Sequence, residues 1–294
     1  MSYASVNGFN HYYEWLTQAG DARTGKPVLV FVHGWGGSAR YWEDTAKALS
    51  RHFDCLLYDM RGFGRSRSGD QAAVADVPVR DDISYELESY AEDLAELLKV
   101  LQIDRVCLNA HSTGSSIAVY FLNRFGDRVD RAVLTCSGIF EYDEKSFKAF
   151  HKFGGYVVKF RPRWLYGLPF MDRLFMQRFL HRSIPATASR AFLEDFLLAE
   201  EAAALGTMFA AVSENAARVM PQEFAKITVP TLLVSGEYDQ IIPAEMGRQA
   251  AALSQQIEYV MIPNTAHFPM LEDPQTYLAH VNQFLGVSTP AQVS

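Results

Sequence analysis

Ser112 stands in a sequence setting that suits a catalytic nucleophile. It lies in the stretch NAHSTGS at positions 109–115, which follows a short apolar run and leads into a segment with helical spacing. A serine at a sharp turn from a strand into a helix is held in strained backbone geometry with its hydroxyl exposed. Small residues must flank it two positions to either side. Ala110 and Gly114 do so, although glycine is usual at the first of these places, and alanine there adds some backbone strain. The setting predicts a nucleophile; the alternative is that Ser112 merely caps the helix.

A serine hydroxyl becomes an effective nucleophile only when a neighbouring base removes its proton. The chain has eight histidines, and His267 is the candidate base. It follows the last predicted strand, and catalytic groups on parallel sheets gather at the carboxyl ends of strands, where Ser112 also lies. His111 is adjacent to the serine, but neighbouring side chains at such a turn diverge, so we expect it to pack or to form hydrogen bonds. His33 ends the first long strand and is expected to brace the loop that follows.

The imidazole in turn needs a carboxylate that fixes its tautomer and balances its charge. Asp239 is the candidate, because it follows a predicted strand in the stretch SGEYDQIIP. Glu237 lies two residues earlier and is its rival. Asp59 also ends a strand, but it precedes the nucleophile and fits a structural role in the loop DMRGFGRS.

The elements that must position these residues alternate along the chain. Two strands joined at Asn7-Gly8 are predicted within 1–17, buried strands at 28–32, 54–59 and 105–110, and further strands at 131–137, 231–236 and 258–263. Helical spacing marks 38–50, 84–102, 113–125, 244–253 and 274–285. This order predicts an α/β fold: a doubly wound, mostly parallel sheet of about eight strands with helices on both faces. Residues 286–294 are expected to fray.

Residues 140–220 interrupt the alternation. They contain no good strand and several helical stretches rich in Phe, Leu, Arg and Ala. We therefore predict a helical cap, or lid, inserted into an α/β core formed by residues 1–139 and 221–294.

The predicted cap is strongly basic. Ten Lys or Arg and a single acid, Asp172, lie between Lys145 and Arg190, whereas the rest of the chain holds 17 basic and 33 acidic residues. The segment is also rich in aromatic residues: Phe150, Phe153, Tyr156, Phe160, Trp164, Tyr166, Phe170, Phe175 and Phe179. Three interpretations fit. The basic face lies in water while the apolar face covers the site, or the cap associates weakly with anionic membrane surfaces, or it recruits an anionic substrate.

Composition excludes several classes of protein. Apolar residues make up 49% and charged residues 21%, which is ordinary for a globular chain. The net charge of −7 argues against nucleic acid as a partner. No run is long enough to span a bilayer, no signal peptide is recognisable, and the three cysteines lie in apolar runs without metal-ligand spacing. We therefore expect a cytoplasmic protein with no metal or organic cofactor. Gly62 and Gly64 alone are weak grounds for a phosphate-binding loop.

Five motifs in this order resemble the α/β-hydrolase superfamily along nearly the whole chain. They are HGWGG at 33–37, DMRGFGRS at 59–66, AHSTG at 110–114, GEYDQIIP at 236–243 and NTAHFPMLEDP at 264–274. The chain order serine, acid, histidine is the one this fold uses. The resemblance implies an oxyanion hole formed by the backbone N–H groups of Trp35 and Thr113. Dehalogenases and epoxide hydrolases of the superfamily carry aspartate as nucleophile, so the serine disfavours both activities.

The expected activity is hydrolysis of carboxylic esters with apolar, medium-length acyl groups through an acyl-enzyme, on a Ser112–Asp239–His267 triad. The partner is then a small-molecule ester. Alternatives on the same triad are cleavage of a C–C or amide bond, acyl transfer and perhydrolysis. A ligand receptor that kept the fold and lost efficient turnover is an alternative of a different class.

Overall fold

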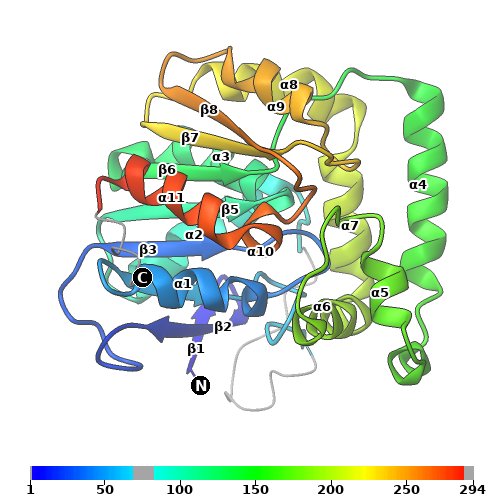
Figure 1. Cartoon of the computed structure of the whole chain (residues 1–294), viewed down its shortest axis with the longest axis horizontal. Coiled ribbons are helices and arrows are strands. Elements are labelled where there is room, and N and C mark those ends of the chain that lie inside the picture. Colours follow the sequence, from blue (N-terminus) through cyan, green and yellow to red (C-terminus); the bar gives the residue numbers. More distant parts are fainter. Residues whose placement is uncertain (1, 69–82, 288–294) are drawn as a thin grey trace.

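The computed structural model describes residues 2–68 and 83–287, and its centre is an eight-stranded sheet (Figure 1). The strand order is β1-β2-β4-β3-β5-β6-β7-β8. The strands are β1 (Ser2–Val6), β2 (Phe9–Leu16), β3 (Val28–Val32), β4 (Asp54–Tyr58), β5 (Val106–His111), β6 (Val129–Thr135), β7 (Thr231–Gly236) and β8 (Ile257–Ile262). β1 and β2 pair antiparallel, β2 pairs antiparallel with β4, and all other pairs are parallel. The predicted fold class is confirmed.

The strand β3 is apolar at every position because both of its faces are covered. Val30 and Val32 belong to a core cluster shared with α2 and α3, whereas Leu29 and Phe31 belong to a second cluster shared with α1 and α11. Alternate side chains of a strand point to opposite faces, so a strand covered on both sides must be apolar at every position. The helices outside the insert are η1 (Ala39–Trp42), α1 (Glu43–Leu49), α2 (Leu87–Val100), α3 (Thr113–Phe125), η3 (Gly126–Arg128), α9 (Ala244–Ala251), α10 (Pro269–Glu272) and α11 (Pro274–Leu285).

Between β6 and β7 the chain forms only helices, which we call the helical insert (residues 144–225). They are α4 (Glu144–Lys159), η4 (Arg163–Gly167), α5 (Met171–Met176), α6 (Ala186–Leu198), α7 (Glu201–Ala211) and α8 (Glu214–Ala225). In Figure 1 the helices α4 to α7 lie to the right of the sheet, with α4 farthest from it, and α8 lies at the top beside α9. The last helix, α8, runs past residue 220 and packs on α3 and α9. The domain division at 140–220 stays a prediction.

Three further sequence expectations concern membrane spans, the cysteines and the C-terminal tail. Within residues 2–68 and 83–287, no helix is both long and apolar enough to cross a membrane. All three cysteines are buried and free. Most of the segment that was expected to fray, 288–294, lies outside the described residues.

Candidate active site

The structure brings Ser112, Asp239 and His267 together from three different connections of the sheet. Ser112 lies between β5 and α3, Asp239 follows β7, and His267 follows β8. The Nε2 atom of His267 lies 3.0 Å from the Ser112 hydroxyl oxygen, and its Nδ1 atom lies 2.8 Å from a carboxylate oxygen of Asp239. All three residues are buried. The three residues selected from sequence therefore form one continuous hydrogen-bonded chain.

The turn that carries Ser112 has the strained geometry predicted for it. Its backbone angles are φ 54° and ψ −124°, and its N–H donates to the carbonyl of Thr135 at 2.9 Å. A side chain at Gly114 would place its Cβ 2.3 Å from the carbonyl oxygen of His33, which is far inside contact distance. The helix can therefore approach the neighbouring strand this closely only with glycine at position 114.

The protonation state of the triad follows from Asp239. Burial raises the pKa of this carboxyl, but His267 nearby and the hydrogen bond to its ring, together with N–H groups of Ile241 and Ile242, bring the pKa below its usual value. The carboxylate is therefore ionised and can only accept hydrogen bonds, so Nδ1 of His267 carries the proton. In a neutral ring Nε2 is then an acceptor, and Ser112 donates to it. This is the arrangement a general base requires.

The two rival acids are engaged elsewhere. Glu237 accepts a hydrogen bond from the N–H of Asn264 at 2.9 Å. Asp59 is fully buried, where it accepts hydrogen bonds from the N–H of Ala39 at 2.8 Å and from the side chain of Arg65 at 2.7 Å. Asp59 therefore holds its own loop in place, in agreement with the structural role expected for it.

His111 links the loop of His267 to the turn after β3. Burial, and then the neighbouring His267, keep the pKa of His111 well below its usual value, so its ring is neutral. Its Nε2–H donates to the carbonyl of His267 at 2.7 Å, and its Nδ1 accepts from the hydroxyl of Tyr41 at 3.0 Å. The same hydroxyl accepts the N–H of Gly34. The ring thus has the hydrogen-bonding role that its position beside the nucleophile predicts.

His33 braces the same turn from the other side. Its Nδ1–H donates to the carbonyl of Gly34 at 2.9 Å, and its Nε2 accepts the N–H of Met60 at 2.9 Å. Both nitrogens are therefore occupied, and the ring is fully buried. This is the role that was expected for it.

The two predicted oxyanion donors flank the nucleophile. A Cβ at Gly34 would lie 3.1 Å from the Cβ of Ser112, so the turn from Gly34 to Gly37 lies directly beside it. Trp35 is the second residue of this turn, and the hydrogen bond that closes the turn leaves its N–H unused. Thr113 is the first residue of α3, where N–H groups have no partner within the helix. Their role at the oxyanion remains a prediction.

The indole ring of Trp35 secures this turn to the insert. Its Nε1–H donates to the carbonyl of Ala204 in α7 at 2.8 Å, and its ring lies 5.6 Å from that of Phe196 in α6. The backbone of Trp35 is therefore fixed by contacts on the insert side as well as by the sheet. The sequence analysis predicted a role for the backbone N–H of Trp35 in the oxyanion hole, but no role for its side chain.

Aromatic side chains of the insert lie against the triad. The ring of Phe179 lies 6.1 Å from that of His267, and the ring of Phe192 lies 5.2 Å from that of Phe268. Under this cover only 9% of Ser112 is exposed. The groups that would contact a substrate are therefore largely apolar.

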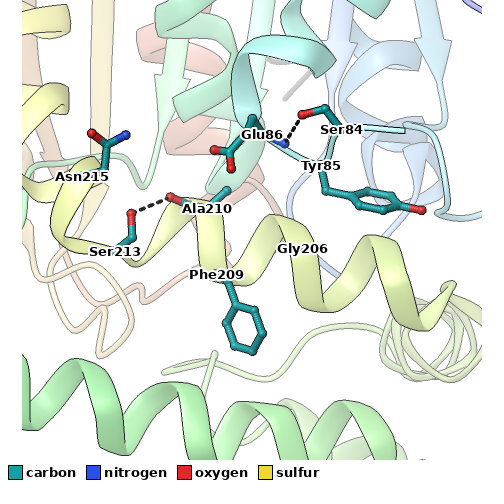
Figure 2. A pocket seen from close by; sticks show the side chains of 8 residues that line it. All are labelled: Ser84, Tyr85, Glu86, Gly206, Phe209, Ala210, Ser213 and Asn215. Atoms are coloured by element: carbon teal, nitrogen blue, oxygen red, sulfur yellow. Dashed lines mark hydrogen bonds between the residues drawn. The ribbon is translucent and has the colours of Figure 1, made fainter. Parts of the chain in front are cut away.

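Two surface cavities lie away from the triad. One, of about 580 Å³, is lined by Ser84, Tyr85, Glu86, Gly206, Phe209, Ala210, Ser213 and Asn215 (Figure 2). The other, of about 470 Å³, lies between the chain after β6 and α8. Neither is lined by a triad residue.

One group of potential metal ligands gathers at the triad. Atoms of His111, Cys136 and His267 lie within 4.8 Å of one another. All four ring nitrogens of the two histidines already have hydrogen-bond partners in the network described above. A metal ion would have to break that network, so these residues do not fit a resident metal.

Glu272 is a functional residue that sequence reasoning missed. One of its carboxylate oxygens accepts the N–H groups of Ala266 at 2.8 Å and Phe268 at 3.3 Å, on either side of His267. The other accepts the N–H groups of His181 at 2.7 Å and Arg182 at 2.8 Å, in the insert. The acid that directly follows the apolar run FPML was the available sequence indication.

We predict that Glu272→Gln destabilises the folded protein and lowers its turnover. The amide would turn a donor toward one pair of N–H groups, which leaves them unsatisfied and costs about 1–3 kcal/mol of the free energy of unfolding. Turnover should also fall, because the loop of His267 loses its support. Urea denaturation and steady-state kinetics measure both effects. Glu258→Gln, on the exposed side of β8, is the matched control; equal behaviour of the two variants contradicts the prediction.

Comparison with known proteins assigns the family. Residues 27–274 match the family described as the alpha/beta hydrolase fold, and the chain belongs to this family. The pimeloyl-(acyl-carrier protein) methyl ester esterase of Nitrosospira multiformis is 27% identical over 278 residues, covering 88% of this chain and 94% of the relative. A hydrolase from Pseudomonas aeruginosa superposes with a TM-score of 0.76 at 23% identity, covering 97% and 98% of the two chains. The enol-lactonase from Burkholderia xenovorans superposes with a TM-score of 0.74 at 22% identity, covering 97% of this chain and 100% of that chain.

Proposed function

We propose that the protein hydrolyses carboxylic esters of apolar acyl groups through an acyl-enzyme. The Ser112 oxygen attacks the ester carbonyl while His267 takes its proton. His267 then returns that proton to the leaving alcohol as the C–O bond breaks. Water, deprotonated by His267, attacks the acyl-serine; the acid leaves as His267 returns the proton to the Ser112 oxygen. Asp239 stays ionised throughout and balances the charge on the imidazolium.

The hydrogen-bonded chain from Asp239 through His267 to Ser112 carries this proposal. Such a chain supplies both a nucleophile and the base that activates it. The N–H groups of Trp35 and Thr113 are the proposed donors to the oxyanion that forms on the carbonyl oxygen. An ester is the proposed bond because the relative from Nitrosospira multiformis, which matches most of this chain, bears the name of a methyl ester esterase.

The apolar acyl preference rests on the aromatic cover. Phe179 and Phe192 lie on the insert side of the site, next to His267 and Phe268. Each methylene group that such a wall removes from water contributes about 0.8 kcal/mol. We therefore expect kcat/KM for p-nitrophenyl octanoate to exceed that for the acetate by at least roughly tenfold.

Two measurements test these proposals separately. Labelling with a fluorophosphonate reports an activated serine whatever the substrate, and peptide mapping should locate the label on Ser112. Turnover of p-nitrophenyl esters from acetate to dodecanoate reports the acyl preference. Labelling without ester turnover would point to a C–C or amide bond, acyl transfer or perhydrolysis. Neither labelling nor turnover is the result expected of a receptor. Equal turnover of acetate and octanoate contradicts the acyl preference alone.

A further inference from the structure

The outer face of the insert exposes an unusual set of large apolar side chains. We use this name for the exposed residues of α4, η4, α5 and their connections: Phe150, Phe153, Tyr156, Phe160, Trp164, Leu168, Phe170 and Leu174. They are eight of the fourteen large apolar side chains that are exposed in the described part of the chain, yet they lie within 25 consecutive residues. Phe160 is 76% and Phe153 68% exposed. Monomeric globular proteins rarely gather such residues on one surface.

The packing of α4 explains why these rings face outward. Gly154 fits against Met208 of α7, and His151 on the same side contacts Phe209 at 4.8 Å between ring centres. This side of α4 is therefore its inner face. Phe153 and Phe160, seven residues apart, lie on the opposite side of the helix. The interpretation in which the apolar face of this segment covers the site fits Phe175 and Phe179, which pack against Phe192, but it does not describe the six exposed rings.

Basic side chains border the exposed rings. Lys152 and Lys159 lie on α4 beside the aromatic stripe, and Arg163 and Arg178 follow on the connected segments. All four are exposed, and among residues 2–68 and 83–287 none of them has an acidic partner. The guanidinium of Arg173 lies 5.7 Å from the ring of Phe170. The positive charge on this face is therefore available to an external partner.

We propose that the outer face of the insert binds the surface of an anionic lipid bilayer. Aromatic rings favour the boundary between headgroups and acyl chains, and Lys and Arg beside them are attracted to anionic headgroups. The remainder of the chain is acidic, with 17 basic and 33 acidic residues. A bilayer of negative charge therefore attracts this face and repels the rest, which fixes the orientation of the protein on the membrane.

Other occupants fit this face less well. A second copy in a twofold arrangement would bring the same basic face against itself, and like charges would oppose the contact. An acidic soluble protein would satisfy the charges, but it would have to supply an apolar surface for six aromatic rings of different orientation. A lipid surface supplies both the charge and the apolar layer without a defined shape. The proposal does not depend on the proposed ester hydrolysis.

Vesicle binding tests the charge part of the proposal. The full chain is mixed with vesicles of phosphatidylcholine alone or with about 30% phosphatidylglycerol, at about 0.05 M and about 0.5 M salt, and bound protein is separated by flotation. We expect binding only to the anionic vesicles at low salt. Each basic residue near such a surface changes partitioning by about fivefold, so Lys152→Glu/Lys159→Glu should weaken it by at least about thirty-fold. Lys47→Glu/Lys99→Glu, which makes the same charge change on exposed residues of the core, is the matched control.

A second measurement tests the aromatic part. Trp164 fluorescence should shift to the blue and be quenched by brominated lipid on binding, and Trp164→Phe should lose this response while still binding. Phe153→Ser/Phe160→Ser should weaken partitioning by roughly tenfold, whereas Val100→Ser on α2 should not. An unchanged circular dichroism spectrum and an unchanged midpoint of urea denaturation show that each variant is folded. The proposal is overturned if anionic vesicles fail to bind at low salt, if the control variants weaken binding equally, or if Trp164 stays in water.

Discussion

Replacing Ser112 by alanine should lower turnover by about 10⁶-fold and leave the fold intact. The hydroxyl is the group that His267 contacts at 3.0 Å, and no other side chain hydroxyl occupies that position. The substitution removes one oxygen atom without adding volume, so the strained turn at φ 54° is retained. Steady-state kinetics on a p-nitrophenyl ester gives the activity, and circular dichroism with urea denaturation gives the stability.

Ser116→Ala is the matched control for this experiment. Ser116 lies one helical turn further along α3, and its replacement should leave turnover within a small factor of the wild-type value. If Ser112→Ala kept more than a small fraction of the wild-type activity in a preparation free of contaminating esterases, the proposed mechanism would be wrong.

Replacing Asp239 by asparagine should lower turnover by roughly 10⁴-fold. The amide can donate to Nδ1 of His267, which favours the tautomer with the proton on Nε2 and removes the acceptor for the Ser112 hydroxyl. The fold should persist, because asparagine has the same shape and can still accept the N–H groups of Ile241 and Ile242. Glu237→Gln is the control. A larger loss of turnover in this control would show that Glu237, and not Asp239, is the acid of the triad.

The wild type and Asp239→Asn together also test how stability depends on pH. The pKa of Asp239 is lower in the folded protein than its usual value. A carboxyl with a lowered pKa stabilises the fold above its usual pKa, and this contribution is lost as the pH falls through the folded value. The free energy of unfolding of the wild type should therefore fall more steeply in acid than that of Asp239→Asn. Parallel curves from urea denaturation at a series of pH values would contradict this.

The strands and the triad could be predicted from sequence because their determinants are local. A continuously apolar run such as Val28–Val32 is explained by burial on both faces of a sheet, whatever lies further along the chain. Ser112 and Asp239 each follow a fully buried strand, His267 follows the last strand of the sheet, and parallel strands bring these carboxyl ends to one edge. Their contact then follows from the topology rather than from any detail of side-chain packing.

What could not be predicted depends on partners far away in the chain. Glu272 acts on residues 181 and 182, which are about ninety residues earlier and belong to the insert. The outward direction of Phe153 and Phe160 depends on which face of α4 meets α7. An amphipathic pattern shows that one helix face is apolar, but it does not show whether that face lies toward the protein or away from it.

The hydrogen bond from the N–H of His267 to the carbonyl of Phe179, 2.9 Å long, has a kinetic consequence. Together with Glu272, it fastens the proposed base to the segment that covers the site. A substrate that enters by displacing this segment breaks these bonds and releases the histidine loop. The base is then aligned only after the segment has closed again over the acyl group. For a substrate that enters in this way, closure and chemical competence would be one event, and the rate of closure would set an upper limit on turnover.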